Sequence, residues 1–474
     1  MAKDEEALLV ESSIPLNHTR DVHILSWAFL LIFLAYGAAQ NLESTINTDG
    51  NLGTTSLGIL YLSFTFFSVI ASLVVRKLGS KNALLLGTSG YWFFIAANLI
   101  PTWYSMVPAS LYLGFAASII WVAQGTYLTS TASSHANDYN LPEGIVIGKF
   151  NGEFWGMFAS HQLVGNLITL AMLRDGQEGG TSGGTPLFII FLFTMSVGTV
   201  LMCFLSKRKS KEEERLQDSS PSLYSSVVSL AKASVSLLLD MRILLVIPLI
   251  LYSGLQAAFV WADFTKYTVK PNLGERGVGG VMAVYGTFDA ICSLAAGRLT
   301  SGLSSITIIV CGGAVIQAIA FSLLLLKHRC ISAGSTRSFL SNDLQSNIAN
   351  LLATYFVPLI CLQPLSIPCS MTSGVLQVIY PLLIAGFLGI GDGVLNTQIS
   401  ALLGILFKHN LEGAFAQFKL WQSLSIAVVF FISPHVAFHI ITATMLAALC
   451  ISFVAFLFLT LKVEAAFSSR ASSS

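Results

Sequence analysis

SKRKSKEEERLQDSSP, residues 206–221, is the only long interior stretch of this sequence that is both strongly charged and free of a hydrophobic segment. Apolar segments of membrane-spanning length lie on both sides of it, and polar landmarks of the first series recur in the second. This arrangement is typical of membrane proteins built from two homologous halves. The sequence therefore predicts two membrane-embedded halves joined by a cytosolic linker.

The composition requires a lipid environment. With 54% hydrophobic and only 10% charged residues among 474, the chain has too little polar surface to cover soluble domains, so the lipid bilayer is its expected partner. A net charge of +1 provides no basic field, and no nucleic acid partner is expected. The seven cysteines form no CxxC pair, which predicts neither a disulfide framework, nor a metal site, nor another cofactor.

Twelve segments are long enough to cross a hydrocarbon core of about 30 Å. The fold class expected is an all-α polytopic membrane protein with two six-helix halves. The predicted spans are Val22–Gln40, Thr54–Val75, Asn82–Ile100, Ser105–Leu128, Phe150–Leu173 and Leu187–Leu205, followed by Ile243–Trp261, Val278–Gly297, Ser304–Leu326, Gln377–Ser400, Phe418–Ser433 and Phe438–Leu461.

Basic residues in alternate connections predict the orientation. Arg76, Lys77, Arg298 and Lys408 join the basic linker on one side, which is expected to be cytosolic, although Lys266 in the seventh connection runs against this rule. Both termini are then cytosolic. The predicted domains are a tail (1–21), the first half (22–205), the linker (206–242), the second half (243–461) and a tail (462–474).

An internal repeat supports the two halves. A shift of 221 residues sets Gly58 on Gly279 and Lys77 on Arg298, whereas a shift of 272 sets Gln124 on Asn396. Two six-helix halves related in this way describe a fold like that of the major facilitator superfamily.

The difference between the two shifts places about fifty extra residues between the ninth and tenth spans. Residues 329–369 begin polar and then carry Pro358, Pro364 and Pro368, a density that excludes an ordinary spanning helix. Codons for Arg329-Cys330 and Cys369-Ser370 can form a splice donor and a splice acceptor. We hypothesise a retained intron; the alternative is a genuine extracytoplasmic loop.

Polar groups inside spans cost about 2.5 to 3.5 kcal/mol each, so each one needs a partner, a cavity or a task. Asp392, Asn396 and Ser400 share one helix face, and Glu153 and His161 are spaced for a proton relay. The alternatives are hydrogen bonds that only hold the bundle together and, for Lys419, snorkelling to the cytosolic face. The candidate cavity or coupling residues are Gln40, Asn41, Gln124, Glu153, His161, Asp289, Asp392, Asn396, Gln398 and Lys419.

Other motifs are few. No Walker loop, nucleophile elbow or pair of catalytic carboxylates occurs, so the protein is not expected to be an enzyme. The amino-terminal string from Asp4 to Leu9 has the spacing of an acidic dileucine sorting signal, with Asp4, Leu8 and Leu9 as its key residues. The alternative is a chance match.

Four separated strings resemble one known family: AAQNLESTINTDGNLGTTSLGILYLSF (38–64), VVRKLGSKNALLLG (74–87), GIGDGVLNTQISALLGILF (389–407) and EGAFAQFKLWQS (412–423). They resemble the uncoordinated-ninety-three-like family of ion-channel regulatory proteins, a branch of the major facilitator superfamily, and its plant members most closely. The resemblance implies a twelve-helix protein that regulates a channel, with links to potassium homeostasis. Transport is not generally established for this family, so the resemblance implies no substrate.

One departure from ordinary facilitators concerns the loop between the second and third spans. Facilitators usually carry an aspartate there that takes part in a charge network, whereas this chain has Arg76 at that position. A cation cannot make the same bonds, which weakens the case for an alternating transport cycle.

Two hypotheses about function follow. The first is a non-enzymatic regulator of an ion channel, expected to be a potassium channel, or of its trafficking, acting with a membrane-protein partner in the plasma membrane or a vacuolar or endosomal membrane. The second is a secondary transporter coupled to protons through Asp289, Asp392 or Glu153. The sequence assigns no oligomeric state.

Overall fold

The computed structural model describes residues 17–46, 52–172, 184–207, 239–335 and 374–471. Regular structure in these residues is entirely helical. The predicted sorting signal, most of the charged linker and residues 336–373 of the predicted insert region lie outside the described residues. The predicted domain boundaries and the retained intron therefore stay predictions.

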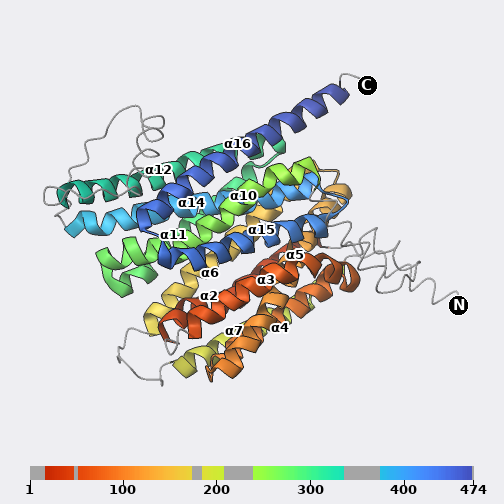
Figure 1. The fold of residues 1–474 in the computed structure, drawn as a ribbon. Coiled ribbons are helices and arrows are strands. Elements are labelled where there is room, and N and C mark those ends of the chain that lie inside the picture. The colour runs from red at the N-terminus through yellow and green to blue at the C-terminus, as the bar shows by residue number, and fades with distance from the viewer. Residues whose placement is uncertain (1–16, 47–51, 173–183, 208–238, 336–373, 472–474) are drawn as a thin grey trace.

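In the described residues the α-helices form two groups of six, one within residues 18–203 and one within residues 241–471, which confirms the expected all-α polytopic architecture (Figure 1). The first group contains α2 (His18–Ile46), α3 (Leu52–Leu78), α4 (Ser80–Ala97), α5 (Trp103–Asp138), α6 (Glu143–Met172) and α7 (Gly184–Cys203). The second contains α10 (Met241–Ala258), α11 (Lys270–Leu299), α12 (Leu303–Ser335), α14 (Gly374–Leu406), α15 (Leu411–Ile432) and α16 (Phe438–Ala471), with the π-helix η3 (Phe259–Val269) and the 3₁₀ turn η4 (Ser433–His435).

The described helices are suited to a bilayer. Nine candidate spans among the described residues are long and apolar enough to cross a membrane, and α4, α6 and α7 complete the first group beside them. Large apolar side chains such as Phe66, Phe193 and Ile308 are exposed on the outside of the bundle. Because these side chains would face water in a soluble protein, the bundle surface fits lipid as its solvent.

Several helices differ in length from the predicted spans. Helix α6 begins at Glu143 rather than Phe150, and α14 continues to Leu406, because helical hydrogen bonding extends beyond the apolar core. The seventh span does not end at Trp261 but continues through η3 to Val269. Helix α12 runs to Ser335, so the segment predicted as an insert from Arg329 begins inside a helix.

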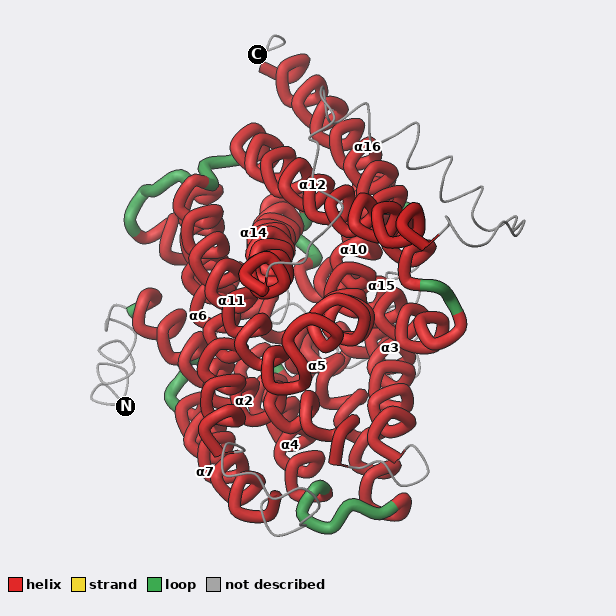
Figure 2. Tube along the Cα trace, turned by 90° about the vertical axis from the view of Figure 1, so that its left-hand side faces the viewer, coloured by secondary structure: helices red, strands yellow, loops and turns green. Residues whose placement is uncertain are grey.

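The two groups meet along two helix pairs that lie on opposite sides of the bundle, α6 with α11 and α3 with α15 (Figure 2). We call these pairs the two seams. In the first seam the backbones approach very closely, since a Cβ added to Gly152 would lie 2.6 Å from Gly297 Cα. Glycine therefore sets the separation of α6 and α11.

One end of the bundle, which we call the basic end, carries Arg76, Arg242 and Lys408. Gly79, with φ of 75°, allows α3 to turn directly into α4 at this end. The charge pattern of the sequence predicts that the basic end faces the cytosol.

The first testable prediction concerns the first seam. Gly152→Ala should lower the thermal stability of the purified protein, because the added methyl group overpacks the contact with Gly297 at a cost of about 1–3 kcal/mol. Gly312→Ala is the matched control, because a Cβ on Gly312 has no neighbour within 4 Å and alanine favours a helix. Thermal denaturation in detergent measures both. Equal stability of the two variants would contradict the close approach of the seam.

Candidate functional site

Buried carboxylates gather on the inner side of the second half. Asp392 on α14 and Asp289 on α11 are each 7% exposed. Asp392 accepts a hydrogen bond from the Tyr285 hydroxyl at 2.6 Å and another from Asn396 Nδ2 at 2.9 Å. Asp289 accepts from the Ser293 hydroxyl at 3.2 Å, and a Cβ added to Gly393, the neighbour of Asp392, would lie 3.0 Å from Asp289 Oδ1. The two carboxylates therefore belong to one polar cluster.

Close backbone packing makes this cluster possible. A Cβ added to Gly393 would lie 2.5 Å from Asp289 O, and one added to Gly389 would lie 2.3 Å from Tyr285 O. Larger residues at these positions would push α14 away from α11. The glycine-rich stretch of α14 thus brings the two aspartates of neighbouring helices together.

Amide and hydroxyl side chains from three more helices extend the cluster. Gln422 on α15 donates from Nε2 to Ser253 Oγ at 3.2 Å and lies 3.5 Å from Asn396 Oδ1. On α10, Tyr252 hydrogen-bonds to Gln317 of α12, and Gln256 donates to the Leu388 carbonyl at 3.2 Å. Unpaired polar groups are costly inside a membrane bundle. These side chains therefore either stabilise the packing of the helices through their hydrogen bonds or bind a ligand or proton.

Lys419 on α15 lies where this cluster meets the first half. Its side chain is 4% exposed, and Nζ donates to Gln422 Oε1 at 2.8 Å. Nζ also lies 4.5 Å from the ring centroid of Trp121 and 5.6 Å from that of Trp155, which belong to α5 and α6 of the first half. Lys419 does not snorkel to the surface, because its ammonium lies over aromatic faces inside the bundle.

Aromatic rings fill the facing part of the first half. Phe33 of α2 packs against Trp121 at 5.0 Å and against Phe158 at 5.1 Å between ring centroids, and Trp121 stacks on Trp155 at 5.8 Å with 9° between the planes. The first half thus presents an aromatic wall, and the second half presents hydrogen-bonded carboxylates.

Other predicted site residues have different surroundings. Glu153 pairs with Lys149 on its own helix at 4.0 Å, and His161 Nδ1 lies 2.6 Å from the Phe158 carbonyl. Neither contact joins Glu153 to His161, and the relay stays a prediction. Gln398 accepts from Thr300 at 3.0 Å. Gln40 donates to Tyr61 at 3.1 Å.

Two further predicted residues bear less on the cluster. Gln124 is buried on α5, at 3% exposure. The side chain of Asn41 lies outside the part of the chain that the structure describes.

Charged contacts join the two halves at the basic end. Arg76 at the end of α3 donates to Asn410 Oδ1 at 3.0 Å, and its Nη2 lies 3.7 Å from Glu412 Oε2 at the start of α15. Lys408 forms an ion pair with Glu143 at the start of α6. We call Arg76–Glu412 and Lys408–Glu143 the basic-end ion pairs. Although burial alone would raise the pKa of Glu143, hydrogen bonds from Lys408 and Ser133 lower it below its ordinary value.

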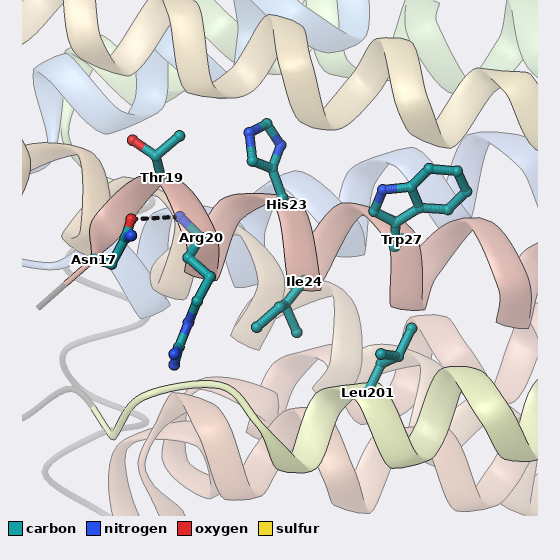
Figure 3. A pocket seen from close by; sticks show the side chains of 7 residues that line it. All are labelled: Asn17, Thr19, Arg20, His23, Ile24, Trp27 and Leu201. Atoms are coloured by element: carbon teal, nitrogen blue, oxygen red, sulfur yellow. Dashed lines mark hydrogen bonds between the residues drawn. The ribbon is translucent and has the colours of Figure 1, made fainter.

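The structure also has an open groove of about 380 Å³ at the start of α2. In Figure 3 its side chains come from the first turns of α2, and Leu201 of α7 lies opposite them. Asn17 there accepts from the backbone amide of Arg20 at 3.0 Å. The predicted site residues do not line this groove, which is therefore distinct from the central cluster; its lining residues are Asn17, Thr19, Arg20, His23, Ile24, Trp27 and Leu201.

Sequence reasoning missed several parts of this arrangement. Tyr285, Trp121 and Trp155 were not singled out, and Arg76 was noted without its partners. A tryptophan well inside a predicted span, such as Trp121, was an available signal, because membrane tryptophans usually lie at the interfaces. The partners of Arg76 are more than 300 residues away in the sequence and left no local pattern.

Solved structures define the class of protein. The E. coli fucose:proton symporter FucP aligns with 92% of this chain and 98% of its own, with a TM-score of 0.59 and 13% identity. The human organic anion transporter MFSD10 (TETRAN) aligns with 93% of this chain and 99% of its own, with a TM-score of 0.61 and 12% identity. The protein therefore has a major facilitator fold, and the apolar spans of its described residues make it an integral, multi-pass membrane protein.

The chain belongs to the UNC-93 family, whose model, described as "Ion channel regulatory protein UNC-93", matches residues 44–457. "UNC93-like protein 3" of Arabidopsis thaliana is 57% identical over 94% of this chain and 88% of the relative. Human "Protein unc-93 homolog A" is 29% identical over 92% of each. The Caenorhabditis elegans "Putative potassium channel regulatory protein unc-93" is 26% identical over 88% of this chain and 57% of the relative.

The second testable prediction concerns the Glu143–Lys408 ion pair. Because the pKa of Glu143 in the folded protein is lowered from its ordinary value of 4.5, the pair stabilises the fold above about pH 4.5, and this contribution is lost as the pH falls through the folded pKa. Glu143→Gln should therefore lower stability at pH 7 by about 0.2–1 kcal/mol, since the pair is partly exposed. The difference in stability between Glu143→Gln and wild type should disappear as the pH is lowered.

Thermal denaturation of both proteins between pH 7 and pH 3.5 measures this gap. The control is Lys77→Gln, which removes an exposed cation from the same end. Its thermal stability should equal that of wild type across this pH range. A gap that is constant across the whole pH range would contradict the assignment.

Proposed function

We propose that this protein is a non-enzymatic regulator of an ion channel, and specifically of a potassium channel or of its trafficking. Its family model is described as an ion channel regulatory protein, and a C. elegans relative is named a putative potassium channel regulatory protein. The partner of such a regulator is another membrane protein, which it meets within the bilayer.

The observation that carries this proposal is the contact between the two halves along the α3–α15 seam. At the basic end Arg76 contacts Asn410 and Glu412. Toward the other end the rings of Tyr61 and Phe430 stack at 5.8 Å. An alternating transport cycle requires one of these ends to separate while the halves rock.

The central side chains connect the halves as well. Thr65 of α3 donates to Ser423 of α15 at 3.0 Å, and Trp155 of α6 donates to Ser400 of α14 at 3.1 Å. Together with Lys419 on the aromatic wall, these contacts join the halves at mid-depth. Because the two halves are joined at the basic end, in the middle and toward the other end, the bundle is suited to act as a scaffold whose outer surface binds a partner.

The proposal also covers the membrane orientation and subcellular location of the protein. The basic connections support cytosolic termini, with tails over 1–21 and 462–474 and a cytosolic linker over 206–242. The acidic dileucine string at Asp4, Leu8 and Leu9 would then be available to cytosolic sorting adaptors. We propose residence in the plasma membrane or in a vacuolar or endosomal membrane.

A second candidate function is proton-coupled secondary transport. The observation that favours it is the pair of buried carboxylates, Asp289 and Asp392, on neighbouring helices of a major facilitator fold. Carboxylates at this depth are chemically able to take up and release a proton.

The third testable prediction uses the Arg76–Glu412 contact. Potassium channels of the same organism are co-expressed with the protein in oocytes, and potassium current and the amount of channel at the cell surface are measured. Wild type should change at least one of these quantities. Arg76→Glu should abolish the effect, because it places two carboxylates together at a buried contact and costs about 3–5 kcal/mol.

The charge-reversed double variant Arg76→Glu/Glu412→Arg should restore regulation, since it restores the pair in the opposite sense. Lys77→Glu is the matched control, because Lys77 is exposed beside Arg76 and should not matter. If wild type reaches the membrane but changes neither current nor surface amount for any potassium channel, the proposed function fails.

A further inference from the structure

The ammonium group of Lys419 occupies a site that both halves of the protein build. Nζ lies 4.3 Å from the ring centroid of Phe418, 4.5 Å from Trp121 and 5.6 Å from Trp155. Only 4% of the residue is exposed. Aromatic faces around a desolvated cation stabilise it, because the negative face of each ring attracts the positive charge.

The other side of the site carries oxygen atoms. Gln422 Oε1 accepts a hydrogen bond from Nζ at 2.8 Å, and Gln422 Nε2 lies 3.5 Å from Asn396 Oδ1, which connects the site to the Asp392 carboxylate. Asp392 is itself held by Tyr285 at 2.6 Å and by Asn396 at 2.9 Å. Aromatic faces and an amide oxygen, backed by a hydrogen-bonded carboxylate, are groups that bind a primary ammonium ion.

The walls of this site are fixed by contacts that do not involve Lys419. Trp155 donates from Nε1 to Ser400 Oγ at 3.1 Å and stacks on Trp121 at 5.8 Å. Gln422 is positioned by its own hydrogen bond to Ser253 at 3.2 Å. Removing the lysine side chain therefore leaves a preorganised site rather than a collapsed one.

We propose that this is a binding site for primary alkylammonium ions, and that in the native protein its occupant is the tethered ammonium of Lys419. The ligand class is set by one cationic –NH₃⁺ group with room for a short, unbranched alkyl chain in place of the lysine side chain. Such a site would bind its ligand whether or not the protein regulates a channel or transports anything.

The experiment vacates the site and supplies the missing group from solution. Lys419→Ala removes the three outer methylene groups and the ammonium, so the matching ligand is n-propylammonium. In purified Lys419→Ala, melting temperature should fall relative to wild type and rise again in a saturable manner with n-propylammonium. Neutral n-propanol and sodium ions should not reproduce the rise, and wild type should not respond.

Second variants locate the ligand. In the Lys419→Ala background, Trp121→Ala should weaken the apparent affinity for n-propylammonium by about tenfold or more, because a desolvated cation–π contact is lost. Asp392→Asn should weaken it as well. Lys462→Ala is the matched control, since Lys462 also lies over a ring, Phe458 at 4.9 Å, but is exposed on the surface, and this variant should show no response.

Three results would overturn the proposal. Folded Lys419→Ala that does not respond to n-propylammonium has no such site, and an equal response to n-propanol shows cavity filling without cation recognition. If Lys419→Ala does not fold, the neutral variant Lys419→Met of similar size replaces it. Lys419→Met should have a lower melting temperature than wild type, and adding Asp392→Asn to it should not lower the melting temperature further. A Lys419→Met protein as stable as wild type would exclude the ammonium site.

Discussion

The central constraint on this structure is the cost of a charge inside a membrane bundle. A lysine at the bilayer centre costs about 2.5 to 3.5 kcal/mol on insertion scales unless the protein compensates it. Lys419 obtains this compensation from both halves, because Trp121 and Trp155 of the first half face its ammonium while Gln422 of the second half accepts its hydrogen bond. The position of one side chain thus depends on the halves staying together.

Close helix packing follows from the same requirement. The polar cluster forms only where α11 and α14 approach within backbone contact, which Gly389 and Gly393 permit, and the first seam depends on Gly152 in the same way. At the basic end Arg76 and Lys408 bind carboxylates of the opposite half. The interior, the seams and the basic end therefore all favour one arrangement of the two halves.

Much of the fold could be predicted from the sequence, because bilayer thickness fixes helix length and charge patterning separates the halves. The face of α14 that carries Asp392 and Asn396 could also be predicted, since helical periodicity places both residues on one side. The partners of these residues could not. Packing between distant helices brings Tyr285 to the polar cluster, Trp121 to Lys419 and Glu412 to Arg76. No local spacing in the sequence records such contacts.

The relay predicted from Glu153 and His161 stays a prediction that rests on spacing alone. Their spacing on one helix is suitable, yet each side chain has a nearer partner on its own helix, Lys149 for Glu153 and the Phe158 carbonyl for His161. Spacing alone does not distinguish a functional pair from residues with such local contacts. The continuation of the seventh span as η3 likewise leaves no composition signal.

If the two halves stay together as a scaffold, the protein by itself should not transport ions or protons. Ion and proton flux is measured across liposomes that contain only the purified protein, as wild type and as Asp392→Asn. We expect no gradient-dependent flux from either folded protein across a broad panel of ions. Flux driven by a pH gradient in wild type and lost in Asp392→Asn would contradict this expectation and would identify the polar face of α14 as a coupling site.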